Sequence, residues 1–178
     1  MTTGDTLSRA MRERDFGALE TVLAPDVVFA SPLTSTVRFE GREEVIALFK
    51  IVREALQDLE YVESFAGDGV EALRFRARVG AEPIEGVDVL RLDEHGRVRE
   101  MSVFVRPLPA AGALLAALAP EVVRPAGRWR AAVAGAMSAP LPVMLRRGDR
   151  LAAWLVRPAA SRAPAARWRH RAARARSR

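Results

Sequence analysis

One carboxylate, Asp88, lies among apolar residues in a stretch, residues 84–92, that has the alternating pattern of a β-strand. Because strand side chains alternate between two faces, the register that turns Leu90 and Leu92 toward the core turns Asp88 the same way. A carboxylate there costs several kcal/mol to bury unless it is paired or protonated. Asp88 is therefore predicted to carry the function. A buried carboxyl bonded to backbone or to an arginine is an equally weighted structural alternative.

Other predicted inward positions are apolar, and they could surround Asp88. They could equally fill a core, which is the commoner fate of such side chains. Ser31 could orient a ligand or a water at the mouth of a pocket, although a Ser-Pro pair that simply ends a strand is the favoured interpretation. The predicted ligand-binding set is Asp88, Ser31, Phe29, Phe49, Phe75, Leu90, Met101 and Val103.

The remaining polar candidates have simpler interpretations. Asp26 follows Pro25 and is interpreted as a strand-entry residue, and His95 as a solvated residue in the turn 93–96. Arginines at 74, 76 and 78 alternate with apolar residues, which predicts a solvated strand face paired with nearby glutamates.

Several classes of chemistry find no support in the 178 residues. The chain has no cysteine, no cluster of His and carboxylates at metal-ligand spacing, and no Rossmann or P-loop glycine pattern. We therefore expect neither a metal nor a cofactor. The first fifteen residues carry charges throughout, and the uncharged stretch 107–120 is too short to span a bilayer, so a cytoplasmic protein is expected.

The elements that must position Asp88 follow from the hydrophobic periodicity. Two short helices are predicted over 6–14 and 16–23, short strands over 26–31 and 37–40, and a long helix over 42–57. Four strands follow, over 60–66, 70–79, 84–92 and 97–106, the last two joined by the turn 93–96. This order predicts an α+β fold in which a curved antiparallel sheet wraps around the long helix.

The charge changes sign along the chain. Residues 1–120 carry a net charge of −6, whereas residues 121–178 carry +12. We expect an α+β domain over 1–108, a basic amphipathic helical extension over 109–157 and a disordered tail rich in Arg and Ala over 158–178. The extension is predicted to contain a short helix over 110–119 and two further helices separated at Pro140 and Pro142.

Residues 126–156 of this extension allow three interpretations. They could lie on an anionic membrane surface, pack over the acidic core or against a protein partner, or bind nucleic acid without specificity. Packing against the core is favoured because the two charges are opposite. Nucleic acid has the weakest support, since no motif reads a base edge.

Three runs, PDVVFASPL, FEGREEVIALF and GVDVLRLDEHGRVREMSVFVRP, occur in an order and spacing that resemble the nuclear-transport-factor-2-like (NTF2-like) superfamily. Within it the chain resembles the SnoaL-like group, which includes polyketide cyclases and ketosteroid isomerases. The resemblance covers about residues 5–108. It implies a cone-shaped, cystatin-like α+β barrel with a deep apolar pocket, often dimeric through the outer face of the sheet.

The resemblance preserves one of three functional positions of the isomerases. The resemblance aligns Asp88 with the aspartate that an apolar site keeps protonated in those enzymes and that donates a hydrogen bond to the substrate oxyanion. The position of the general base holds Ser31, and that of the tyrosine in the first helix holds Leu7. Whether the protein is an enzyme is therefore left open.

Three hypotheses remain. The pocket could bind a small apolar or carbonyl-bearing molecule through Asp88 without chemistry. The protein could be an isomerase-like or cyclase-like enzyme in which Asp88 is the acid or base and a water near Ser31 assists. It could also be a homodimeric scaffold whose C-terminal helices bind partners.

Overall fold

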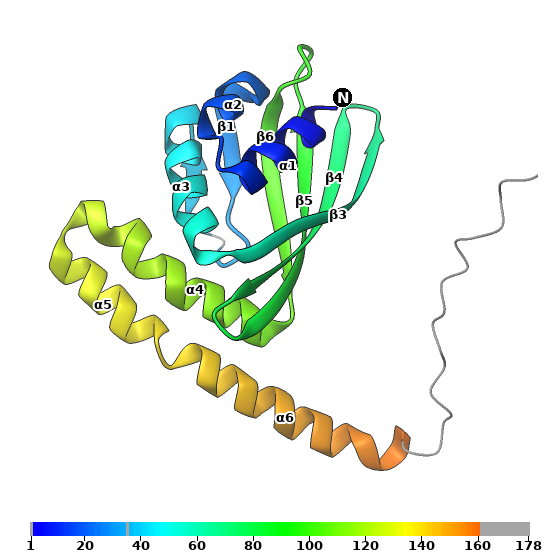
Figure 1. Ribbon diagram of the computed structural model, residues 1–178. Coiled ribbons are helices and arrows are strands. Elements are labelled where there is room, and N and C mark those ends of the chain that lie inside the picture. The colour runs from blue at the N-terminus through cyan, green and yellow to red at the C-terminus, as the bar shows by residue number, and fades with distance from the viewer. Residues whose placement is uncertain (1, 35, 161–178) are drawn as a thin grey trace, which may run out of the picture.

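A curved, open sheet of six strands forms the body of the protein (Figure 1). The computed structural model describes residues 2–34 and 36–160, with side chains up to Val156. The strand order is β2-β1-β6-β5-β4-β3, in which β1 and β6 are parallel and the other neighbours are antiparallel. The strands are β1 (Leu23–Ala30), β2 (Arg38–Glu40), β3 (Gln57–Gly67), β4 (Val70–Val79), β5 (Glu82–Leu92) and β6 (Val98–Arg106). The predicted α+β class and curved sheet are confirmed, but the sheet is not closed into a barrel and one strand pair is parallel.

Strands β3 to β6 form the predicted antiparallel meander. Along β4 the inward side chains, among them Leu73 and Phe75, are buried, while the arginines between them face outward. Arg74 pairs with Glu63 at 3.1 Å and Arg78 with Asp58 at 2.8 Å, so the predicted solvated, ion-paired face is confirmed. Both pairs are exposed, and exposed pairs contribute little to stability.

A tight turn and a helix cap stabilise one end of the sheet. The Asp93 carboxylate accepts hydrogen bonds from the backbone N–H groups of His95 and Arg97, and Gly96 takes the positive φ of 74° that the turn requires. At the same end of the sheet Glu71 is buried and accepts a 2.6 Å hydrogen bond from the N–H of Gly4 in the first turn of α1. A carboxylate at this place satisfies a helix N-terminus that has no partner within the helix.

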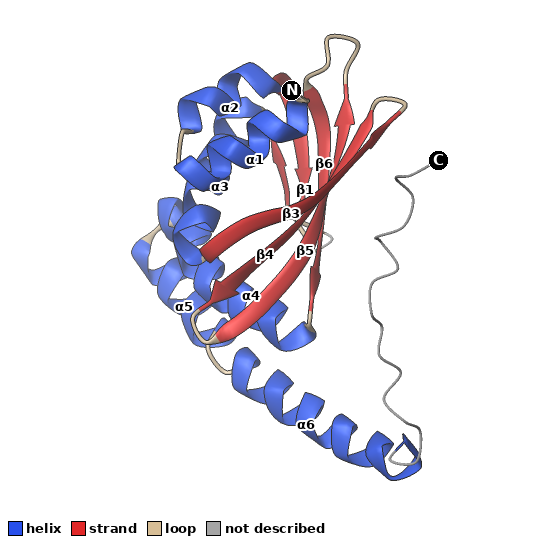
Figure 2. Ribbon diagram, turned by 45° about the vertical axis from the view of Figure 1, so that its right-hand side comes forward, coloured by secondary structure: helices blue, strands red, loops and turns tan. Residues whose placement is uncertain are grey.

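Four helices cover one side of the sheet (Figure 2). The apolar stripe of α3 is buried through Val45, Leu48 and Phe49, as its periodicity predicts. These helices are α1 (Thr3–Glu13), α2 (Phe16–Val22), α3 (Arg42–Ala55) and α4 (Leu108–Val123). Their buried side chains and those of the sheet form a single core.

The C-terminal extension differs in detail from its prediction. Helix α4 is longer than the predicted 110–119 and continues past Pro120 by about a turn. A short 3-10 turn, η1 (Arg124–Ala126), leads to α5 (Arg128–Ser138) and α6 (Leu141–Ala160). The break between α5 and α6 is where it was predicted. Pro142 does not break a helix, because it lies in the first turn of α6, where its missing N–H costs no hydrogen bond.

The expected domain boundary at residue 108 stays a prediction. Immediately after it, α4 contributes Ala110, Leu114 and Leu118 to the same core as the sheet. Residues 161–178 of the tail expected to be disordered lie outside the described residues, and 158–160 belong to α6.

Candidate functional site

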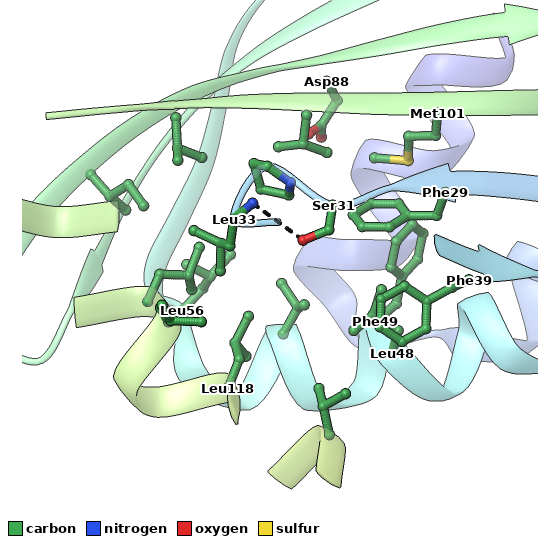
Figure 3. Close-up of a pocket in the computed structure, with 18 of the residues that line it drawn as sticks. Phe29, Ser31, Leu33, Phe39, Leu48, Phe49, Leu56, Asp88, Met101 and Leu118 are labelled. Atoms are coloured by element: carbon green, nitrogen blue, oxygen red, sulfur yellow. Dashed lines mark hydrogen bonds between the residues drawn. The ribbon is translucent and has the colours of Figure 1, made fainter. Parts of the chain in front are cut away.

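An apolar cavity of about 230 Å³ lies between the concave face of the sheet and the helices (Figure 3). Residues of helices α1, α3 and α4 and of all six strands line it. Among the described residues that line it, few are polar: Ser31, Thr34, Tyr61 and Asp88. The site is therefore an apolar chamber with isolated polar groups, which is the usual character of a small-molecule pocket.

Asp88 lies in the wall of this cavity, on the inward face of β5, as predicted. Asp88 is only 4% exposed, and its backbone lies between Leu73 of β4 and Val103 of β6. Burial disfavours the charged form and raises the pKa of Asp88 to about 7, against the opposing effect of a hydrogen bond from Tyr61. Near neutral pH the carboxyl is thus divided between its acid and its carboxylate, and it can donate or accept a proton.

Tyr61 is a site residue that the sequence analysis did not identify. It lies on β3, and its hydroxyl donates a 3.1 Å hydrogen bond to Oδ2 of Asp88. Burial, followed by the negative charge of Asp88, raises the pKa of Tyr61 well above its ordinary value, so the phenol keeps its proton and stays a donor. The sequence could have indicated it, because Tyr61 is the chain's single tyrosine and lies two residues after Leu59, so that both side chains are expected on the same inward face of the strand.

Phe75 and Gly86 set the position of Tyr61. The rings of Tyr61 and Phe75 meet edge to face with centroids 6.1 Å apart. Phe75 in turn lies directly over Gly86, where a Cβ would collide with the ring. The absence of a side chain at Gly86 therefore lets Phe75 lie flat against β5 and support the tyrosine.

Ser31 stands at the end of β1 and lines the same cavity, as predicted. Its Oγ accepts a 3.2 Å hydrogen bond from the backbone N–H of Leu33 (Figure 3). This contact orders the loop after β1, which fits the strand-ending interpretation. The proton of the hydroxyl is not used by that contact, so Ser31 can also donate to a ligand or a water.

Aromatic side chains form one wall. Phe29 contacts Phe39 and Phe49 edge to face, with centroids 6.1 and 5.8 Å apart. The predicted residues Phe29, Phe49, Phe75, Met101 and Val103 all line the cavity, and so does Leu7, the position at which the resemblance to the isomerases leads us to expect their tyrosine. Their binding of a ligand stays a prediction.

Leu90 does not line the cavity, contrary to the prediction. It is fully buried, but it lies one inward position beyond Asp88 toward the β5–β6 turn. Its neighbour on β4 is Glu71, which caps α1, so this part of the sheet is covered by helix packing. The alternation that placed Asp88 inward could not distinguish the filled end of the fold from the hollow one.

Within the described ranges 2–34 and 36–160, no group of three or more His, Cys, Asp or Glu side chains could hold a metal ion. In the same ranges no helix is long and apolar enough to cross a membrane. Asp88 and Tyr61 are two titratable groups in direct contact. Together they can bind a polar atom of a ligand and exchange a proton with it.

An open curved sheet with helices and an apolar cavity on its concave side defines the NTF2-like class of α+β domains. The sequence profile of the SnoaL-like domain matches residues 5–101, more than half of the chain. The protein belongs to the SnoaL-like family.

Solved structures agree with this assignment. A steroid delta-isomerase from Pseudomonas aeruginosa is 30% identical, with a TM-score of 0.62 over 68% of this chain and 91% of that chain. An uncharacterized protein with a cystatin-like fold from Silicibacter pomeroyi is 27% identical, with a TM-score of 0.66 over 70% of this chain and 87% of the other. An NTF2-like protein of unknown function from Mesorhizobium loti, 18% identical with a TM-score of 0.53 over 59% of this chain and 88% of that one, shares the fold. No curated protein has a significant match.

Proposed function

We propose that the cavity binds a small apolar molecule with one carbonyl group, and that this group is bound by Asp88. The observation that supports the proposal most is a buried carboxyl with a pKa of about 7 in the wall of an otherwise apolar chamber. The volume of about 230 Å³ lies below the roughly 300 Å³ at which pockets for drug-sized ligands begin. The ligand is therefore small.

The acid form of Asp88 is the form suited to this task. A protonated carboxyl donates a hydrogen bond to a carbonyl oxygen, and in an apolar site such a bond has no competing water. Tyr61 contacts Oδ2 and fixes the orientation of the carboxyl. The rest of the ligand would contact apolar side chains, from Phe29 and Phe49 on one side and Leu118 of α4 on another.

A second candidate is proton transfer at carbon next to that carbonyl. Two observations favour it: the pKa of Asp88 lies near neutral pH, and a relative of 30% identity is a steroid delta-isomerase. In this scheme the Asp88 carboxylate removes a proton from the α-carbon, the C–H electrons form the enolate, and the same proton is returned to another carbon. Ser31 or a water beside it would donate to the enolate oxygen.

Binding can be tested with the full chain and a matched pair of probes. Fluorine NMR would compare para-fluoroacetophenone, which has a carbonyl, with para-fluoroethylbenzene, which does not. We expect the ketone to bind more tightly, and the difference to vanish in Asp88→Leu while binding of the hydrocarbon persists. Equal affinities in the unmodified protein would contradict the proposed role of Asp88.

The catalytic candidate requires a separate assay. A β,γ-unsaturated ketone is converted by proton transfer into its conjugated isomer, which absorbs in the near ultraviolet. Turnover that disappears in Asp88→Asn but persists in Phe104→Ala, a change at an exposed outer-face residue, would support the enzyme. Ketone binding without turnover would leave the binding function alone.

A further inference from the structure

Helices α5 and α6 carry large apolar side chains that face solvent. On α5, Trp129 and Met137 are about 70% exposed, at 68% and 73%. On α6 the exposed residues include Met144, Leu151 and Leu155, which recur at i, i+7 and i+11 and so lie on one stripe. The exposed apolar residues of the two helices are Trp129, Val133, Met137, Val143, Met144, Leu151, Trp154, Leu155 and Val156.

Among the residues that the structure describes, contacts with the rest of the protein hold the first half of α6. Leu145 packs closely over Gly112 of α4, and Arg146 pairs with Glu82 of β5 at 3.0 Å. The second half extends away from the sheet and the other helices in both views (Figures 1 and 2). The predicted packing of the basic extension on the acidic core therefore holds for the Arg146–Glu82 contact and leaves residues 149–156 uncovered.

Helices α5 and α6 are strongly basic. Residues 128–160 contain six arginines against Asp149 alone, a net charge of +5. On α6, Arg147 lies three residues after Met144 and four before Leu151, so it borders the apolar stripe of Met144, Leu151 and Leu155. Trp154 and Arg150 lie further round the helix on the same side as Arg147, whereas Arg146 lies opposite the stripe. An exposed apolar stripe with arginines and a tryptophan along one edge forms an amphipathic surface.

We propose that α5 and α6 form a binding surface for an anionic phospholipid membrane. A bilayer surface offers negative phosphates and, a few ångströms deeper, an apolar layer, which matches the basic side and the apolar stripe of α6. Each arginine near such a surface raises the affinity about fivefold. A helix of this kind lies in the plane of the interface and does not cross the bilayer, consistent with the finding that no described helix can span it.

A second copy of the chain fits this surface less well. The outer face of the sheet offers few free acidic groups, because Glu63 and Glu85 already pair with Arg74, and Asp58 with Arg78. Glu82 is used by Arg146 of the same chain. Anionic lipid provides the missing negative charge without drawing on these pairs.

The position of the surface connects it to the cavity. Helix α4 supplies Leu114 and Leu118 to the cavity wall, and the other side of α4 packs against α5 near Pro120 and against α6 at Gly112. A membrane bound by α5 and α6 would therefore lie one helix away from the cavity. An apolar ligand of the kind proposed above partitions into bilayers, so the two sites would have a common source of ligand.

The test uses the full chain and vesicles of phosphatidylcholine with or without about a third of phosphatidylglycerol. Co-sedimentation would measure affinity for the unmodified protein, for Leu151→Ser/Leu155→Ser and for Arg147→Glu/Arg150→Glu. Phe104→Ser is the matched control, since Phe104 is equally exposed, at 64%, on the outer face of the sheet. Trp129→Phe/Trp168→Phe leaves Trp154 as the sole tryptophan, and its quenching by brominated lipid would report insertion of α6.

We expect binding to anionic but not to neutral vesicles, a loss of at least about tenfold in both α6 variants, no loss in Phe104→Ser, and quenching of Trp154. Unchanged binding in Leu151→Ser/Leu155→Ser would overturn the proposal, because it would assign the binding to basic residues elsewhere, such as those of 161–178. Absence of vesicle binding would also overturn it. Light scattering provides a third check. If it shows a concentration-dependent dimer that Leu151→Ser/Leu155→Ser abolishes, a second copy of the chain covers this surface and the proposal is overturned.

Discussion

The hydroxyl of Tyr61 on β3 reaches over β4 to donate a 3.1 Å hydrogen bond to the carboxyl of Asp88 on β5. The two residues therefore interact across an intervening strand. The alternation of residues within β3 or within β5 does not predict this contact. The pair combines a phenol that keeps its proton with a carboxyl whose pKa is about 7. Most of the expected behaviour of the site follows from this contact.

The stability of the protein should fall as Asp88 ionises. Its pKa is raised from an ordinary 3.8 to about 7, so between these values the folded state holds a proton that the unfolded state releases. The contribution of Asp88 to stability is thus fully present below about pH 4, declines toward pH 7, and is constant above. The full shift corresponds to a loss on the order of 4 kcal/mol.

Asp88→Asn removes this ionisation and keeps the shape of the side chain. We expect the variant to gain stability relative to the unmodified protein as pH rises from 4 to 7, measured by urea unfolding at several pH values. The quantity compared is the difference in unfolding free energy between the variant and the unmodified protein at each pH. This difference cancels the contribution of Asp93, whose pKa is lowered by hydrogen bonds from the Arg97 and His95 backbone and which therefore destabilises both proteins in acid. A difference that stays constant with pH would show that Asp88 is not held in its acid form.

Tyr61→Phe should raise the pKa of Asp88 further. The hydrogen bond from the phenol stabilises the carboxylate and opposes the effect of burial, so its removal leaves burial alone. NMR titration of the Asp88 side-chain carbon would measure the change directly. Phe65→Leu, at an exposed position on the same strand, should leave the titration unaltered.

Affinity for a ketone should depend on pH through the same group. If the acid form of Asp88 donates to the carbonyl, binding of para-fluoroacetophenone weakens as pH rises through about 7. The hydrocarbon probe should show no such dependence, and neither probe should show it in Asp88→Asn. A ketone affinity that rises with pH would instead indicate that the carboxylate is the binding form.

The sequence was informative where a local pattern repeats. Strand β4 was predicted over 70–79, as observed, because its apolar residues and arginines alternate without interruption. The inward direction of Asp88 followed from the same rule applied to β5. Periodicity reports which face a side chain occupies, and both successes are of that kind.

The sequence analysis was wrong or incomplete where the result depends on which residues of other elements an inward-facing side chain contacts. Tyr61 was not identified because its partner lies two strands away, and that distance depends on the register of two hairpins together. Helix α4 was not connected to the pocket because an Ala-rich helix has a weak apolar stripe, yet Leu114 and Leu118 complete the wall. Leu90 was assigned to the pocket because alternation is the same in the packed and the hollow parts of a sheet.

Gly86→Ala should disturb the site through Phe75. The added methyl group would occupy the place of the Phe75 ring, which must then move and take its edge-to-face contact with Tyr61 with it. Overpacking of this kind costs about 1–3 kcal/mol, which thermal unfolding would show. Gly67→Ala is the control, since no heavy atom lies within 4 Å of its added Cβ and the residue sits at the end of a strand.

Val103→Phe should close the cavity without unfolding the protein. Val103 lies opposite Asp88 on β6 and lines the chamber, so a larger ring there can occupy empty space where a packed core would resist it. We expect affinity for both fluorinated probes to fall at least about tenfold while the unfolding midpoint in urea changes little. Val89→Phe adds the same volume on the other face of β5 and should leave probe binding intact. Probes that still bind Val103→Phe with full affinity would place the ligand site outside this cavity.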